Sequence, residues 1–275
     1  MSTSFVHLHL HSEYSLSDGI VRIEELVSAA AAARMPAVAV TDLANLFGAV
    51  KFFQKAVKAG VKPILGSDVW LENPVDRNKP YRLVLLCLDR QGYLNLNQLL
   101  TRAYADGQHS GRPCIQREWF SGYSDGLIAL SGALDGDIGQ ALVGGHADAV
   151  ERLAREYQQW FPQRFYIELQ RTGQPLQEEC VHASVELAAR VGLPVAATNA
   201  VQFLKADAFE AHEVRVCIQD SRVLTDTRRP RLYTPEQYFR SAEEMADLFQ
   251  DIPEALANTV EIARRCNFRL DLGRN

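Results

Sequence analysis

Short apolar runs alternate with amphipathic helical segments along most of this 275-residue chain. Segments such as IEELVSAAAAAR and EECVHASVELAARVG place apolar residues at helical spacing. Val-, Ile- and Leu-rich strands that are each followed by a helix predict parallel strands covered on one side. Seven such units predict a closed (β/α) barrel with one unit fewer than the eightfold form. The predicted strands span residues 5–11, 37–42, 64–71, 82–88, 126–131, 165–170 and 194–199.

The region from residue 207 onward changes character, because its segments are helical without intervening strands. DAFEAHEVRVCIQD, TPEQYFRSAEEMADLF and PEALANTVEIARRC carry helical periodicity, and TPEQ and SAEE have the form of capping boxes. We therefore predict a barrel over residues 1–206 and a helical extension over residues 207–275 that packs on it.

The composition is that of a globular protein, with 47% hydrophobic residues and a net charge of −5. The sequence has no apolar run of about 18 residues and no basic segment before an apolar one, so we expect neither a membrane span nor a secretory signal. Five scattered cysteines without a CxxC pair are typical of reduced cytoplasmic thiols. The negative charge argues against an extended DNA-backbone surface, and TRRPRLY is read most simply as a solvated loop.

Histidines alternate near the start of the chain, in FVHLHLHSEYSLSDG. In an extended strand His7, His9 and His11 would point the same way, and Asp18 follows just beyond. Imidazoles with a carboxylate are ligands that divalent transition metals prefer. The alternative is a half-buried strand whose histidines bind backbone carbonyls. The end of a barrel strand, where Asp42 and Asn199 also fall, is where functional residues gather.

Longer segments carry a resemblance to a known family. HLHSEYSLSDG and AVAVTDLANLFGAVKF resemble the opening of the PHP (polymerase and histidinol phosphatase) domain. KPILGSDVWL, GLIALSGALDGDIG and GLPVAATNAVQFL follow in the order found in the N-terminal PHP domains of the bacterial DNA polymerase III alpha-subunit family. The resemblance implies an α/β fold, a seven-stranded distorted TIM-like barrel with an appended C-terminal helical segment. It also implies a parent protein that is a DNA-directed DNA polymerase, a nucleotidyltransferase, whereas we expect this region alone to be inactive.

Active members of the family hold a cluster of metal ions, and the resemblance assigns the ligand positions. His9 and His11 match the first motif, Asp18 matches its acidic ligand, and Asp68 stands where a glutamate is usual. These four residues are the remnants of the metal site. Six positions have lost their ligand: Leu43, Arg82, Ala133, Thr172, Ala200 and Gln202. We therefore expect no metal cluster and no cofactor in this domain. A weak single site at His9, His11 and Asp18, or adventitious zinc, stays open.

Loss of the cations would crowd the carboxylates of Asp18, Asp42 and Asp68 together, which is costly at low dielectric. Arg82 carries a fixed positive charge at a former ligand position. We predict that it pairs with one of these aspartates, most favourably Asp18 or Asp68, and that the two histidines bind carboxylates or carbonyls. Glu168 is a further candidate for a buried carboxylate at this pocket, or for a salt bridge at a strand end.

The remaining histidines and helical cysteines are predicted to be surface or core residues: His109, His146, His182, His212, Cys217 and Cys266.

Three functions compete. The depleted ligand set favours a non-catalytic scaffold, and the resemblance implies that it docks the proofreading exonuclease subunit and acts on DNA only through the full-length polymerase. The alternatives are a metal-dependent phosphoesterase or pyrophosphatase, and an intrinsic proofreading exonuclease. Both alternatives need most of the ligands together.

Overall fold

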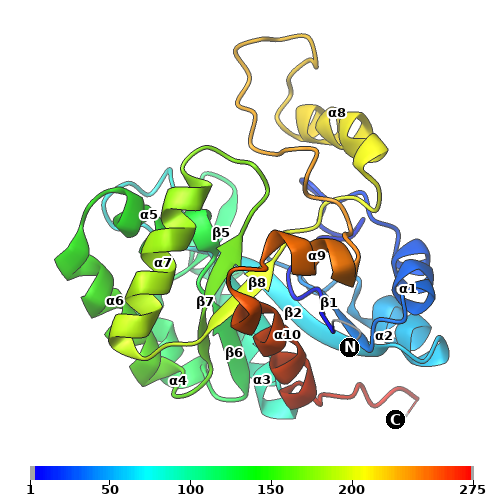
Figure 1. The fold of residues 1–275 in the computed structure, drawn as a ribbon, viewed down its shortest axis with the longest axis horizontal. Helices are drawn as coiled ribbons and strands as arrows, with labels where there is room; N and C mark the ends of the chain where they lie inside the picture. Colours follow the sequence, from blue (N-terminus) through cyan, green and yellow to red (C-terminus); the bar gives the residue numbers. More distant parts are fainter. Residues whose placement is uncertain (1–3, 274–275) are drawn as a thin grey trace.

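The computed structural model describes residues 4–273, apart from the side chains of residues 147 and 148 (Figure 1). Its strands are β1 (Ala37–Val40), β2 (Lys62–Leu71), β3 (Tyr81–Cys87), β4 (Gln108–His109), β5 (Arg112–Ile115), β6 (Leu127–Leu130), β7 (Phe165–Gln170) and β8 (Val195–Thr198). Its α-helices are α1 (Ile23–Ala32), α2 (Ala49–Lys58), α3 (Arg90–Ala105), α4 (Phe120–Tyr123), α5 (Asp137–Val143), α6 (Ala147–Trp160), α7 (Gln177–Val191), α8 (Phe209–Gln219), α9 (Ala242–Leu248) and α10 (Pro253–Arg265). No helix in this described part is long and apolar enough to cross a membrane.

The strands form a ring in the order β1–β2–β3–β6–β7–β8. The extended residues 5–11 close it, because the carbonyl of His7 accepts from the amide of Ala39 at 2.8 Å, and the carbonyl of His9 accepts from the amide of Val201 at 3.0 Å. The predicted α/β fold, a barrel of seven extended segments with a helical C-terminal segment, is therefore confirmed. The short hairpin of β4 and β5, which joins the edge of β2, was not predicted.

Residues 5–11 are not a regular strand, which corrects one expectation. In a regular strand, residues two apart bind the same neighbour. Here His7 binds β1, whereas His9 and His11 bind Val201 on the other side. This irregularity turns His7 away from the other two histidines, so the three side chains do not share a face.

The prediction that all strands run parallel was wrong for β3. This strand is antiparallel to both β2 and β6. The connection from β2 to β3, residues 72–80, contains Pro74 and Pro80 and has no helix. A short connection suits an antiparallel pair, whereas a parallel pair needs a crossover of a dozen or more residues.

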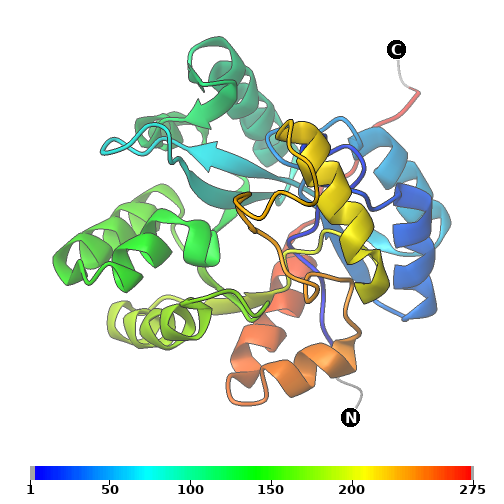
Figure 2. The same cartoon turned by 90° about the horizontal axis from the view of Figure 1, so that it is seen from above.

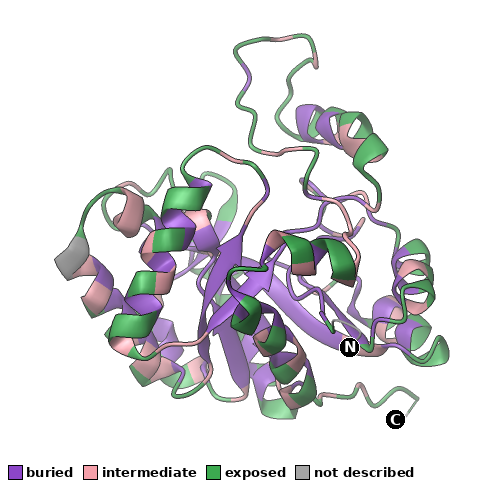
Figure 3. Ribbon diagram, viewed as in Figure 1, coloured by how far each residue is buried: buried purple, intermediate pink, exposed green. Residues whose placement is uncertain are grey.

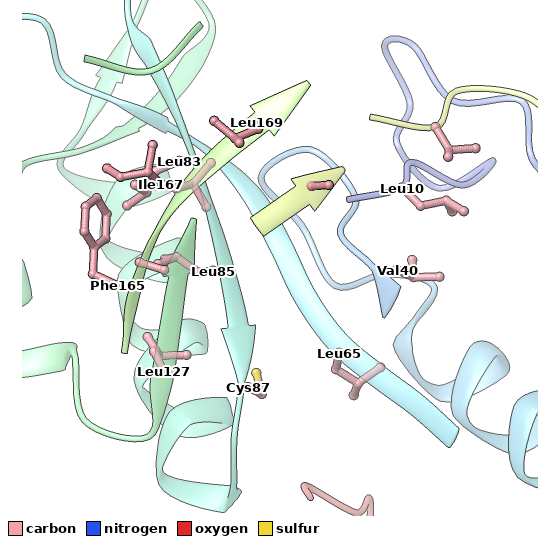
Figure 4. Packing of buried hydrophobic residues seen from close by; sticks show 14 of the residues in the cluster. Leu10, Val40, Leu65, Leu83, Leu85, Cys87, Leu127, Phe165, Ile167 and Leu169 are labelled. Atoms are coloured by element: carbon pink, nitrogen blue, oxygen red, sulfur yellow. The ribbon is translucent and has the colours of Figure 1, made fainter. Parts of the chain in front are cut away.

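The hydrophobic core has two layers. The larger layer lies between the outer face of the strands and the helices, and Leu83, Leu85, Phe165 and Ile167 belong to it (Figure 4). The strands of the ring are accordingly buried along most of their length, while most helices bury only the side that faces them (Figure 3). The smaller layer fills the barrel and includes Val6, Leu8, Ile64, Val84, Leu86, Ile128 and Ala196.

Helix α10 closes the end of the barrel where the parallel strands begin. Its Ile262 and Ala263 belong to the inner layer. The hydroxyl of Thr259 accepts from the backbone amide of Val6 at 3.1 Å, and the side-chain amide of Asn258 donates to the carbonyl of Val195 at 2.8 Å. This leaves the opposite end, where the parallel strands finish, for the pocket.

The predicted helix over TPEQYFRS does not form. Residues 232–240 have no helical structure, and α9 begins after Ser241 with the complete capping box predicted at SAEE. The side chain of Gln237 does accept from the amide of Thr234 at 3.1 Å, as in a capping box. Its backbone carbonyl is bound by the barrel amide of Gln202 at 2.9 Å, so the segment follows the barrel and forms no helix.

Gly132, just after β6, lies close against the backbone of Arg82 and offers a test of the fold. It has φ +76°, and a Cβ there would lie 2.2 Å from the carbonyl oxygen of Arg82. Gly111 has the same φ with nothing within 4 Å of a Cβ. We expect Gly132→Ala to lower the free energy of unfolding by about 1–3 kcal/mol more than Gly111→Ala, because only the first adds a clash to the backbone strain. Denaturant unfolding measures this, and equal losses would contradict the close approach.

Candidate functional site

The site lies in a cavity of about 1500 Å³ at the end of the barrel where the parallel strands finish. His9, Asp18, Asp68, Arg82 and Gln202 are among the residues that line it. Seen from above, α8 and the segment that follows it lie across this end of the ring (Figure 2). Four of the residues predicted to line a pocket at the strand ends, His9, Asp18, Asp68 and Arg82, therefore line the same cavity.

Asp68 is at the centre of the site and is fully buried. Its Oδ2 lies 3.0 Å from Nε2 of His9 and 3.2 Å from Nε2 of His11. Arg82 reaches the same carboxylate with two nitrogens, and its Nε is 3.0 Å from Oδ1. Burial alone would raise the pKa of Asp68, but Arg82 and the two histidines hold it well below its usual range.

The antiparallel direction of β3 explains why Arg82 reaches Asp68. In the β2–β3 register Asp68 is opposite Val84, so Arg82 is its diagonal neighbour on the same face. The guanidinium also lies over the ring of Trp70, 4.4 Å from its centroid. Arg82 is thus fixed by an ion pair on one side and an aromatic face on the other.

Each of the two pocket histidines lies between two carboxylates. Nδ1 of His9 is 2.7 Å from Oε1 of Glu168, and Nδ1 of His11 is 3.0 Å from Oδ1 of Asp18. Since Nε2 of each ring faces Asp68, both nitrogens must donate, which requires the charged imidazolium form. Burial opposes that charge in His9, but the two carboxylates outweigh it and raise its pKa to about 10; the pKa of His11 is also raised.

The outer carboxylates have further donors. Asp18 accepts from the hydroxyl of Ser15 at 2.6 Å and of Tyr233 at 2.9 Å. Glu168 accepts from Gln170 at 2.9 Å, from the amide of Gly132 at 3.0 Å and from the hydroxyl of Thr198. Burial works against ionisation of both carboxylates, yet the adjacent histidines hold the pKa of each below its usual value.

The six charged groups in direct contact are balanced. Three carry positive charge and three carry negative charge: His9, His11 and Arg82 against Asp18, Asp68 and Glu168. We call these six residues the charge network. Its three carboxylates are balanced by the two protonated imidazoles and the guanidinium of Arg82.

Asp42 is close by but is not part of this network. It accepts from the amide and hydroxyl of Ser12 at 2.6 and 2.8 Å. Burial raises its pKa to about 6, and the Ser12 hydrogen bonds act in the opposite direction. Asp42 therefore stabilises the turn after the histidines, whereas Arg82 pairs with Asp68.

The positions that lack a family ligand fall into different surroundings. Leu43 lines the cavity beside Asp68, and Gln202 places its amide 3.3 Å from Nδ1 of His11. Thr172 is turned into the protein, where its amide donates to the side chain of Gln177 at 2.5 Å. Ala133 and Ala200 have φ values of 47° and 41°, a left-handed backbone that alanine rarely adopts.

His7 is outside the site. Its ring is stacked on Phe239 at 4.4 Å between centroids, and its Nε2 lies 2.9 Å from the carbonyl oxygen of Arg240. Burial lowers its pKa to about 4. It is a neutral core histidine that holds the segment before α9 against the barrel.

Tyr233 is the residue that sequence reasoning missed. Its hydroxyl donates to Asp18, although 215 positions separate the two residues. The surrounding TRRPRLY stretch indicated only a basic loop, and no local pattern marks a tyrosine that reaches a carboxylate from a distant segment.

Three side chains here offer suitable ligand atoms for a single cation, but each of them already binds other charged groups of the protein. Atoms of His9, His11 and Asp68 lie within 4.8 Å of one another. This group contains Asp68 where the sequence had indicated Asp18. Arg82 binds the same carboxylate, and Nδ1 of each imidazole faces a second carboxylate, so a cation would have to displace the guanidinium and break the hydrogen bonds of both rings. The residues present do not fit a metal cluster.

Comparison with known families matches residues 7–172 to the PHP domain. The chain belongs to the PHP domain family. It is 51% identical over 275 residues to the DNA polymerase III subunit alpha of Pseudomonas fluorescens, and 48% identical over 269 residues to that of Escherichia coli K12. These matches cover 100% and 98% of this chain but 23% of each relative, so the chain spans about a quarter of their length.

Among solved structures, the chain is similar to an amidohydrolase from Chromobacterium violaceum, described with bound sulfate and no metal. The TM-score is 0.48 with 17% sequence identity, and the match covers 77% of this chain and 97% of that one.

Arg82→Ala tests whether the guanidinium sustains the site. We expect it to lower the free energy of unfolding by about 3–5 kcal/mol, because Asp68 would keep a buried charge with one partner removed. Arg155, which is 67% exposed and pairs with Glu151 at 3.9 Å, gives a matched control whose replacement by alanine should have little effect. Thermal or denaturant unfolding of both variants decides, and an unchanged Arg82→Ala would refute the role.

The raised pKa of His9 predicts a pH dependence. Its charged form contributes stability fully below about pH 6.5, its unfolded value, and that contribution is lost as the pH rises through about 10. The stability advantage of the parent over His9→Gln should therefore shrink between pH 7 and 10 in chelator-containing buffer. Unfolding measured across this range tests it. A constant difference would mean that His9 is neutral in the folded protein.

Proposed function

We propose that this chain is the PHP domain of a replicative DNA polymerase III alpha subunit and that it serves as a non-catalytic scaffold. The observation that carries the proposal is the Arg82–Asp68 ion pair at the centre of the former metal site. A guanidinium stays protonated under all ordinary conditions, so it occupies this carboxylate permanently with positive charge.

Hydrolysis of phosphoesters by metal clusters depends on cations that lower the pKa of bound water and neutralise the developing charge. Neutral imidazoles and free carboxylates must be available to hold them. Here the imidazoles are charged and each carboxylate has protein donors. The charge network thus neutralises the buried carboxylates, as cations would, but it supplies no metal ion that could activate a water.

The relatives named DNA polymerase III subunit alpha support the rest of the proposal. On this basis the parent protein is a DNA-directed DNA polymerase of the bacterial cytoplasm, and this region takes part in DNA replication without catalysing nucleotidyl transfer. Its partners would be the remainder of the alpha chain and the proofreading exonuclease subunit.

A metal-dependent phosphoesterase, pyrophosphatase or intrinsic exonuclease is the second candidate. The convergence of His9, His11 and Asp68 favours it, because these are three suitable ligands in one place. It requires Arg82 to leave Asp68, which makes metal content and activity the deciding measurements.

We expect the purified chain to hold well under one equivalent of metal and to show no metal-dependent hydrolysis of a model phosphodiester or pyrophosphate. The matched variant restores all six ligand positions with Leu43→His, Arg82→His, Ala133→Cys, Thr172→His, Ala200→Asp and Gln202→His, and should regain metal binding. Elemental analysis and hydrolysis assays test both. Metal-dependent activity in the parent that His11→Ala abolishes would establish the second candidate.

Docking of the exonuclease subunit is tested separately. We expect the chain and this subunit to co-migrate in gel filtration at micromolar concentration. The variant with six restored ligands should bind equally well, since a scaffold role does not use the metal. Separate migration of the parent chain would remove docking from the proposal without affecting the inactive site.

A further inference from the structure

The segment that returns from α8 toward α9 crosses the mouth of the barrel (Figure 2). We call residues 229–239 the strap. Arg231, Leu232, Tyr233 and Gln237 of the strap line the cavity that contains the charge network. The strap therefore forms one wall of the opening through which the cavity meets solvent.

The second half of the strap is tied to the barrel mostly through the strap's own backbone groups. Asn199, just after β8, donates its side-chain amide to the carbonyls of Glu236 and Tyr238, both at 2.8 Å. The amide of Phe239 donates to the carbonyl of Phe203 at 3.0 Å. These bonds fix where the strap ends and leave its first half to be held by side chains.

Tyr233 connects the first half of the strap to the charge network. Its hydroxyl donates to Oδ2 of Asp18 at 2.9 Å, while Oδ1 of Asp18 faces His11. A hydrogen bond to an ionised carboxylate is stronger than one between neutral groups. The hydroxyl of Tyr233 thus links the strap to the charge network.

The outer part of the strap is bound to α8 more than to the barrel. Arg229 and Glu213 of α8 form an ion pair at 2.5 Å in which both side chains are 4% exposed. Residues 220–228 beyond it are mostly exposed. The loop of residues 220–228 thus projects beyond α8, whose inner side is buried against the body of the protein (Figure 1).

The closed arrangement carries a cost beneath Tyr233. The ring of His212 in α8 packs edge-on against that of Tyr233, 4.7 Å between centroids, and is fully buried. Both of its nitrogens lack a hydrogen-bond partner among the described residues. A buried polar group without a partner is unfavourable, and opening the strap would let water bind it.

We propose that the strap is a lid over the cavity and that the Tyr233–Asp18 hydrogen bond is its latch. The latch opposes the cost of the unpartnered His212, and it acts beside the bonds from the side chain of Gln174 to the carbonyl of Leu232 at 2.7 Å and from the hydroxyl of Thr234 to the carbonyl of Thr172. Release of Tyr233 would let the first half of the strap move away from His212, with the backbone bonds near residues 236–239 as the fixed end and with α8 held in place by the bond from Arg215 to the carbonyl of Leu16. This inference stands whether or not the chain docks an exonuclease.

Hydrogen exchange of the 275-residue chain with Tyr233→Phe tests the latch. We expect amides of residues 231–234 to exchange at least about tenfold faster than in the parent, as for loss of a hydrogen bond to a charged group. Amides of β7 should be unchanged. The matched control is Tyr238→Phe, which removes the bond from that hydroxyl to the exposed Glu244 and should leave the amides of residues 231–234 unaffected.

Limited proteolysis gives a second measurement at the same place. Trypsin can cleave after the exposed Arg228 and Arg231, and Tyr233→Phe should speed cleavage there relative to Tyr238→Phe. Exchange and cleavage equal to the parent would overturn the proposal. Equal acceleration in β7 would also overturn it, because the hydroxyl would then support the whole fold and not a lid.

Discussion

The buried negative charge of Asp68 is the constraint on which the rest of the site depends. An unpaired carboxylate in the interior would be neutralised by protonation. Arg82 prevents this, and His9 and His11 add two further donors to the same group. Those cations must in turn be compensated, which draws in Asp18 and Glu168 as outer carboxylates. The network extends outward until its charges cancel, and it stops at neutral donors such as the Tyr233 hydroxyl.

A guanidinium can replace cations only where the backbone aims it correctly. Arg82 reaches Asp68 because β3 runs antiparallel to β2 and makes the two residues diagonal neighbours on one face. Gly132 then supports both sides of the network. Its amide donates to Glu168, and its missing side chain lets the carbonyl of Arg82 approach. The same antiparallel strand that departs from a regular barrel is thus what makes a metal-independent site geometrically feasible.

The sequence predicted most strands of the barrel from their periodicity. The pairing of Arg82 with an aspartate was predicted from charge, once the family resemblance had placed Arg82 at a former ligand position. It did not predict where His7 points, because a one-residue irregularity in an extended segment has no local signature. The direction of β3 was predictable from the short, proline-containing connection before it. The contact of Tyr233 with Asp18 was not, since it depends on how a distant segment folds back.

Buried ion pairs rarely give more stability than apolar residues of the same volume, so stability does not explain why such a network is present. Its partners come from separate parts of the chain: the opening segment, β2, β3, β7 and the strap. An apolar filling would accept many relative placements of these parts, whereas directional bonds between charged groups accept few. The network therefore specifies how the segments at the barrel mouth are arranged.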